Sequence, residues 1–133
     1  MARAIAKVRE NYTIDCEVDG FKYTLDKSKE NGGNGLGASP GGYLLAALAG
    51  CKAMVASAYC KSRGIKADIE VRVSDTWDTV DGSDKLRATV ELDIKGEFDE
   101  KQKKILSKIA QSQCTVADII KEENEVETRV IFN

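Results

Sequence analysis

The sequence predicts an α+β fold, in which helices are segregated from antiparallel strands. Apolar and polar residues alternate over residues 12–25 and again over 69–94, which is typical of half-buried strands. An apolar, helix-like run covers residues 39–64 between these two regions, and a second helical region follows residue 99. The chain has 133 residues and no internal repeat, so we assign residues 1–133 to a single domain.

The elements follow one another in the order β-β-β-α-β-β-α-α-β. The first strands occupy residues 1–25, where Asp19-Gly20 is typical of a two-residue hairpin turn between YTIDCEV and FKYTL. Residues 27–39 contain four glycines, and they are expected to form an exposed, mobile loop. A long hairpin follows over residues 69–94, with a second turn signal at Asp81-Gly82.

The long central helix has clear end signals. Ser39 is suited to the N-cap, Pro40 to the first helical position and Gly64 to the position after the C-terminal end. We expect Cys51 at the centre of its apolar stripe, and Cys60 about 180° around the helix on the other face. The expected stripe consists of Leu44, Leu48, Cys51, Val55 and Ala58.

Helical signals return near the C-terminal end of the chain. Asp99 and Gln102 form a possible capping box at the start of a helix. That helix is interrupted at Cys114, and Thr115 begins a further short one. A closing strand is predicted over Val126, Thr128, Val130 and Phe132.

Composition limits the classes of partner. The formal net charge is −2, from 20 basic and 22 acidic residues, which gives no electrostatic reason to expect nucleic acid or a membrane surface. The longest apolar run, Tyr43–Cys51, is shorter than a membrane span needs. The N-terminal residues lack the apolar segment of a signal peptide, so we expect a cytoplasmic protein.

The four cysteines and the absence of histidine restrict the chemistry. Without histidine there is no Cys–His catalytic pair, and no two cysteines have the C-x2-C spacing of a zinc site, so no metal or cofactor is predicted. Cys16 and Cys60 are interpreted as packing residues. For Cys51 and Cys114, both a packing role and a reactive role remain possible interpretations. Cys114 stands at a helix start, where backbone N–H groups would lower the pKa of its thiol.

Two segments resemble the signatures of the OsmC family, which includes the organic hydroperoxide resistance proteins. SPGGYLLAALAGCKAMVASAYCKSRGI is similar to the family's central helix with its reactive cysteine, and IAQSQCTVADII is similar to its second cysteine signature. The two cysteines stand 63 positions apart with a long hairpin between them, as in the family. The resemblance covers essentially the whole chain and implies an OsmC-like fold that forms an intertwined homodimer.

The resemblance also implies a function in the oxidative stress response. Cys51 would attack an organic hydroperoxide as a thiolate, Cys114 would then form a disulfide with it, and a dithiol reductant, possibly of the lipoyl type, would reset the pair. An apolar substrate site is expected from Tyr43, Leu44, Leu48 and Met54.

The sequence departs from the family at the residues that stabilise the thiolate. The family uses an arginine held by a glutamate nine or ten positions before the reactive cysteine, where this chain has Gly42 and Gly41. Arg9 is the best match for the arginine, and Lys27 or Lys29 is an alternative. The competing interpretation, which the sequence favours, is that Arg9 is a solvated charge at a strand edge. A second hypothesis is therefore a redox-sensing or small-molecule-binding protein without efficient peroxidase turnover, and a third treats both cysteines as packing.

Overall fold

The computed structural model describes residues 2–121, 127 and 129 of the chain. They form two compact units, one that ends at Ala46 and one that begins at Ala47. The predicted closing-strand residues Val126, Thr128, Val130 and Phe132 lie outside the described residues. All the other predicted elements are present in the predicted order, which confirms the α+β class.

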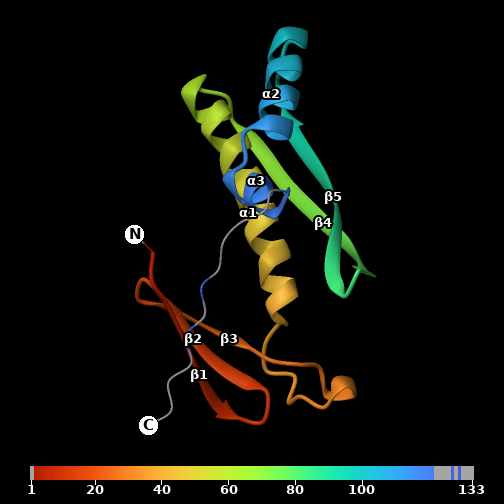
Figure 1. Ribbon diagram of the computed structural model, residues 1–133. Helices are drawn as coiled ribbons and strands as arrows, with labels where there is room; N and C mark the ends of the chain where they lie inside the picture. Colours follow the sequence, from red (N-terminus) through yellow and green to blue (C-terminus); the bar gives the residue numbers. More distant parts are fainter. Residues whose placement is uncertain (1, 122–126, 128, 130–133) are drawn as a thin grey trace. The chain divides into compact units, whose positions relative to one another are not determined.

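The first unit contains a three-stranded antiparallel sheet (Figure 1). Strands β1 (Ala4–Glu10), β2 (Thr13–Val18) and β3 (Phe21–Leu25) pair in sequence order. Asp19 and Gly20 have φ values of +49° and +87°, which is the left-handed backbone that a type I′ hairpin turn requires. The turn predicted at these two residues is confirmed.

The glycine-rich segment after β3 is more ordered than the sequence suggests. It contains a short 3-10 helix, η1 (Lys29–Asn31), and folds around the carboxylate of Asp26, which is only 2% exposed. That carboxylate accepts hydrogen bonds from Thr13 Oγ1 and from the backbone N–H groups of Lys27, Asn34 and Leu36. The sequence-based expectation of a mobile loop rested on glycine content alone. Glycine content does not show that the carboxylate of Asp26 is buried and orders the segment around it.

The central helix, α1 (Pro40–Ser62), has the predicted ends. Ser39 Oγ accepts the N–H of Gly42 at 3.1 Å, as an N-cap residue does. At the other end Gly64 has φ +65°, and the N–H of Ile65 bonds back to the carbonyl of Cys60 at 2.9 Å, which is a Schellman motif.

The buried face of α1 differs from the predicted stripe. Cys51 and Val55 are only half-buried, and Leu44 and Ala58 are exposed. The hairpin and the later helices pack against a face of α1 that is rotated by about one residue from the predicted stripe. This face includes Cys60 and Lys52. The buried residues of α1 are Leu48, Lys52, Ala56, Tyr59 and Cys60.

By length and composition alone, α1 also resembles a membrane span. Its most apolar window has a mean hydropathy of 1.4, although the run Tyr43–Cys51 by itself is shorter than a span. Core helices of proteins that do not cross membranes reach similar values, so this property is weak grounds for a membrane location.

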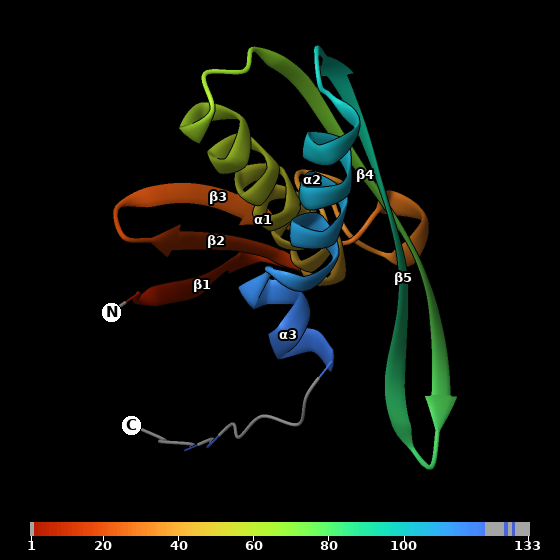
Figure 2. The ribbon, with the colours of Figure 1, turned by 90° about the horizontal axis from the view of Figure 1, so that it is seen from above.

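The second unit is built from the rest of α1, a hairpin and two further helices (Figure 2). Strands β4 (Ala67–Val80) and β5 (Ser83–Gly96) pair along their full length, from Ala67 opposite Gly96 to Val80 opposite Ser83. Asp81 and Gly82 have φ values of +52° and +76°, which confirms the predicted turn. In both ribbon views the tip of this hairpin extends past the helices of the unit.

Helices α2 (Glu100–Ser112) and α3 (Thr115–Lys121) complete the described chain. Asp99 and Gln102 form the predicted capping box, with bonds of 2.7 and 3.0 Å. One core cluster joins α1, α2 and the hairpin around Ala56 and Leu106, and a second surrounds Leu48 and Cys114. The second cluster holds the candidate site.

Candidate active site

The structure brings Cys51 and Cys114 together inside the second unit. Cys51 lies near the middle of α1, and Cys114 occupies the break between α2 and α3. Both belong to the cluster formed with Leu48 and Ala117, and their sulfur atoms interact by a hydrogen bond. Both are free thiols, so the structure represents the reduced pair.

The surroundings of Cys51 favour its thiolate. Its pKa is lowered chiefly by the backbone N–H of Val116 and by the thiol of Cys114, which both donate to the sulfur. Burial opposes this effect, while the N–H of Thr115 and the charge of Lys52 add to it. A lowered pKa increases the share of the nucleophilic thiolate at neutral pH.

The pKa of the Cys114 thiol is shifted in the opposite direction, upward. Burial raises the pKa of its thiol, and the negative charge on Cys51 raises it further. The N–H of Ala117 lies 3.4 Å from its sulfur and only partly offsets these effects. Of the two thiols, Cys51 is therefore the one that ionises more readily, and Cys114 is the one that donates a hydrogen bond to it.

This asymmetry corrects the sequence-based expectation for Cys114. Its position before a helix suggested that the helix's first N–H groups would lower its own pKa. In the structure, the N–H groups of Thr115 and Val116 are directed at Cys51 instead. The break between α2 and α3 thus assists the thiol on the other helix.

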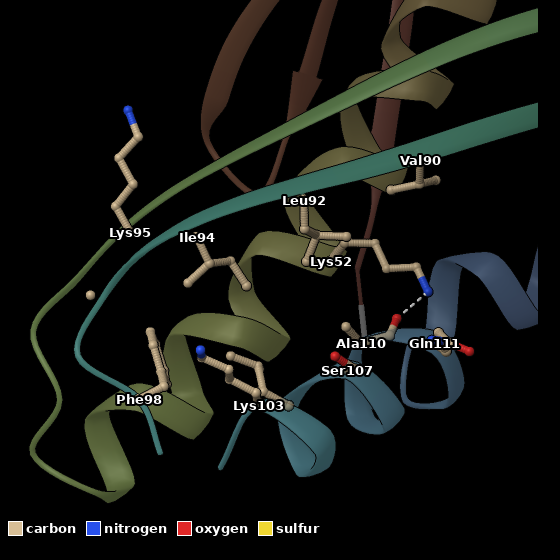
Figure 3. A pocket seen from close by; sticks show the side chains of 12 residues that line it. Lys52, Val90, Leu92, Ile94, Lys95, Phe98, Lys103, Ser107, Ala110 and Gln111 are labelled. Carbon is tan, nitrogen blue, oxygen red and sulfur yellow. Dashed lines mark hydrogen bonds between the residues drawn. The ribbon is translucent and has the colours of Figure 1, made fainter. Parts of the chain in front are cut away.

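Lys52 is the residue that sequence reasoning missed. It is 7% exposed, and its Nζ donates a hydrogen bond of 2.5 Å to the carbonyl oxygen of Ala110 (Figure 3). Its charge lowers the pKa of both thiols. The available signal was spacing: Lys52 stands four residues after Leu48 and four before Ala56, which places a cation on their buried face.

The predicted substrate-binding residues are spread over both units. Leu48 packs in the cluster that contains the two thiols. Tyr43 lies in the first unit, where its hydroxyl donates to the carbonyl of Thr24 at 2.9 Å, and Leu44 is exposed in the same unit. Met54 is 75% exposed on α1. The substrate-binding role of these four residues stays a prediction.

The predicted cations also lie in the first unit. Arg9 on β1 forms a two-pronged salt bridge with Asp15 on β2, with bonds of 2.5 and 3.1 Å. Lys27 lies over the ring of Tyr12, 4.3 Å from its centroid, and Lys29 begins η1. A contribution of any of these three to the thiol site stays a prediction. Among the described residues of the second unit, Lys52 is a cation whose charge acts on Cys51.

The described residues offer no obvious metal centre. Over residues 2–121, 127 and 129, no three His, Cys, Asp or Glu side chains gather so that they could hold a metal ion.

The comparison with protein families identifies the chain's relatives. The family model described as OsmC-like protein matches residues 32–129, which include both thiols and the hairpin between them. This chain belongs to the OsmC-like family. The family includes organic hydroperoxide resistance proteins. The comparison with curated protein sequences finds no match.

Solved structures confirm the OsmC-like fold. An OsmC-like protein from Mycoplasma pneumoniae is similar with a TM-score of 0.77 at 21% identity, over 91% of this chain and 87% of the other. The organic hydroperoxide resistance protein OsmC of Legionella pneumophila gives 0.70 at 19%, over 91% and 89%. OhrB of Bacillus subtilis gives 0.61 at 22%, over 89% and 88%. At these identities the likeness shows the fold alone.

Proposed function

We propose that this OsmC-like protein is a thiol peroxidase that reduces organic hydroperoxides with Cys51 and Cys114. The observation that carries the proposal is the meeting of the two thiols in one cluster, where nearby backbone N–H groups favour ionisation of Cys51 over that of Cys114. A peroxidase needs this pairing because the thiolate is the nucleophile, and a nearby thiol must then condense with its oxidised product. The peroxidase members of the family support the same reading.

The proposed reaction has two steps on the protein. The Cys51 thiolate attacks an oxygen of the O–O bond, which gives a sulfenic acid on Cys51 and an alkoxide that takes up a proton and leaves as the alcohol. The thiol of Cys114 then attacks the sulfenic sulfur, so that a disulfide forms and water leaves. The hydroperoxide is reduced by two electrons, and the two thiols are oxidised by the same number.

An external dithiol completes the cycle. It attacks the disulfide through a mixed disulfide and leaves in its own oxidised form, restoring both cysteines. A lipoyl-type dithiol remains our proposed reductant, and the cytoplasm, which is a reducing compartment, remains our proposed location.

In this proposal Lys52 supplies the positive charge that the family's arginine, held by its glutamate, would otherwise provide. Glycine occupies both candidate glutamate positions, 41 and 42, so an arginine has no carboxylate there to hold it. A buried ammonium group beside Cys51 stabilises negative charge on the sulfur without such a partner. Arg9 is retained as a second candidate cation.

We further propose that the protein acts as a homodimer. Several large apolar side chains of the second unit are exposed in a single chain: Met54 on α1 is 75% exposed, and Trp77 and Val80 near the hairpin tip are 48% and 50% exposed. An apolar helix face and a projecting hairpin are suitable surfaces for association with a second copy.

The missing glutamate supports one alternative, a redox-sensing or small-molecule-binding protein without efficient turnover. The two proposals differ in how fast Cys51 reacts. A peroxidase oxidises Cys51 much faster than a free thiol and prefers organic hydroperoxides, whereas the alternative predicts a rate close to that of a free thiol.

The deciding experiment is the second-order rate of Cys51 oxidation by cumene hydroperoxide and by hydrogen peroxide, followed by stopped flow. Mass spectrometry of the product should reveal a Cys51–Cys114 disulfide. Cys51→Ser should remove the fast phase, and Cys16→Ser, which alters a cysteine of the first unit, should retain it. A slow reaction without preference between the two peroxides would refute the peroxidase and favour the alternative.

A further inference from the structure

A second feature of the same unit is a cavity of about 720 Å³ between β5 and α2 (Figure 3). This volume lies in the range of cavities that hold a small organic ligand. Its apolar lining comes mainly from Val90, Leu92 and Ile94 on β5 and from Phe98 and Leu106. Cys51 and Cys114 are not among the lining residues, although the cavity shares Lys52 with the thiol site.

Side chains alternate between the two faces of β5, and its acidic residues lie on the face away from the cavity. Val90, Leu92 and Ile94 face the helices, whereas Glu91 and Asp93 lie on the opposite face of the hairpin. Glu91 and Asp93 are both within ion-pair distance of Arg72, at 3.5 and 3.9 Å. Among the residues that the structure describes, no aspartate or glutamate lines the cavity.

Lysines supply the charge that the cavity does have. Figure 3 shows the ammonium groups of Lys103 and Lys52 toward opposite ends of the row formed by Ile94, Leu92 and Val90, while Lys95 points away from it. Lys103 pairs with Glu100 at 3.3 Å, but both side chains are largely exposed, so this pair is weak and easily exchanged. Lys52 bonds only to a neutral carbonyl among the described residues.

We propose that this cavity binds a small amphipathic anion, that is, a carboxylate or similar group joined to an apolar chain. The anionic group pairs with Lys103 at the exposed end of the cavity, near Phe98. The apolar chain lies along Ile94, Leu92 and Val90, and its far end approaches the aliphatic stem of Lys52. This assignment needs no peroxide chemistry and does not depend on the proposed function.

Dodecanoate is a suitable probe, titrated below its micelle concentration into the full-length Cys51→Ser protein by isothermal titration calorimetry. We expect saturable binding, with affinity rising about fourfold for each added methylene from octanoate to dodecanoate. Dodecyltrimethylammonium, which has the same chain with the opposite charge, should bind much more weakly. Equal binding of both amphiphiles would overturn the proposal, because charge would then contribute nothing.

Two matched substitutions on α2 locate the anionic group. Lys103→Glu should weaken dodecanoate binding about fivefold or more, while Lys104→Glu makes the same change of charge at an exposed lysine that does not line the cavity and should have little effect. Equal losses in the two variants would refute a specific site.

The cavity could instead be covered by a second copy of the chain. In that case dodecanoate would fail to bind the dimer but would bind the monomer, and Lys103→Glu would change the mass measured by analytical ultracentrifugation. Either result would contradict the proposal. Binding of dodecanoate to Cys51→Ser without peroxidase activity in the parent protein would retain the ligand site and reject only the peroxidase.

Discussion

The ammonium group of Lys52 donates a hydrogen bond to the carbonyl oxygen of Ala110 at 2.5 Å and so joins α1 to the last turn of α2. Ala110 stands four positions before Cys114. The same contact therefore satisfies a carbonyl at a helix end, holds the segment that carries one thiol and brings positive charge to both. These combined roles give a physical reason for a lysine in the interior of the unit.

Lys52→Met tests the role of that charge. Without the ammonium group, the pKa of Cys51 should rise, so its alkylation by iodoacetamide at neutral pH should slow several-fold and the rate profile should move to higher pH. Loss of the bond to Ala110 should also cost about 1–3 kcal/mol of stability. Mass spectrometry of alkylated Cys51 across pH measures the first effect separately from the second.

Lys52→Arg and Lys61→Met are the controls for this change. Arginine keeps the charge and should largely restore the pH profile, and Lys61 is an exposed lysine of the same helix whose loss should not move it. A Lys52→Met profile identical to that of the parent protein would show that the charge does not act on Cys51.

Cys114→Ala tests the hydrogen bond between the thiols. The neutral thiol of Cys114 lowers the pKa of Cys51, so removing it should raise that pKa and slow the first oxidation step. The variant should also accumulate the sulfenic acid of Cys51, which dimedone labels, because no second thiol is present to condense with it. Cys60→Ala removes a buried thiol elsewhere in the unit and should leave dimedone labelling low. Equal labelling of the two variants would contradict a resolving role for Cys114.

Asp26→Asn tests the acid sensitivity of the first unit. Burial alone would raise the pKa of Asp26, but the hydrogen bonds from Thr13 and from the N–H groups of Leu36, Lys27 and Asn34 outweigh it, so the pKa falls below its ordinary 3.8. Because the folded pKa is the lower one, the carboxylate stabilises the fold above pH 3.8, and this stabilisation is lost as pH falls through the folded value.

Urea unfolding between neutral pH and pH 3 measures this effect. Asp26→Asn should lower stability at neutral pH and flatten the decline on acidification, whereas Glu17→Gln, on the exposed side of β2, should preserve the parent's pH dependence. If the stability of Asp26→Asn fell on acidification as steeply as that of the parent protein, a group other than Asp26 would control the acid sensitivity.

Asp99→Ala tests the start of the helix that leads to Ala110. The carboxylate of Asp99 accepts the N–H of Gln102 at 2.7 Å, so its removal should destabilise the protein by about 1 kcal/mol. Asp99→Asn keeps an acceptor and should recover most of this loss, as measured by thermal unfolding. An equal drop in melting temperature for both variants would mean that the charge, not the cap, is what matters.

Local signals predicted most of the fold. The confirmed features each involve groups within a few residues of one another. They are the two Asp-Gly turns, the Ser39 cap, the Gly64 end and the Asp99–Gln102 capping box. Such features are readable because their physics is contained in a short stretch of chain.

The candidate site was only partly predictable because it depends on contacts between distant segments. The family signatures pointed to Cys51 and Cys114, but no local pattern shows which of the two receives the N–H groups of Thr115 and Val116. The buried role of Lys52 likewise depends on Ala110, 58 positions away. The predicted stripe was chosen by hydrophobicity alone, so it excluded Lys52. The predicted buried face of α1 was therefore rotated by about one residue from the observed one.

The wide separation of the two thiols along the chain has a consequence for heat stability. A bond between Cys51 and Cys114 would close a loop 63 positions long that contains the entire hairpin and α2. Closing such a loop removes conformational entropy from the unfolded chain worth on the order of 4 kcal/mol. A protein that runs the proposed peroxidase cycle would then alternate between a cross-linked form that resists melting and a reduced form that melts earlier. Its melting temperature would therefore report how much of the protein is oxidised.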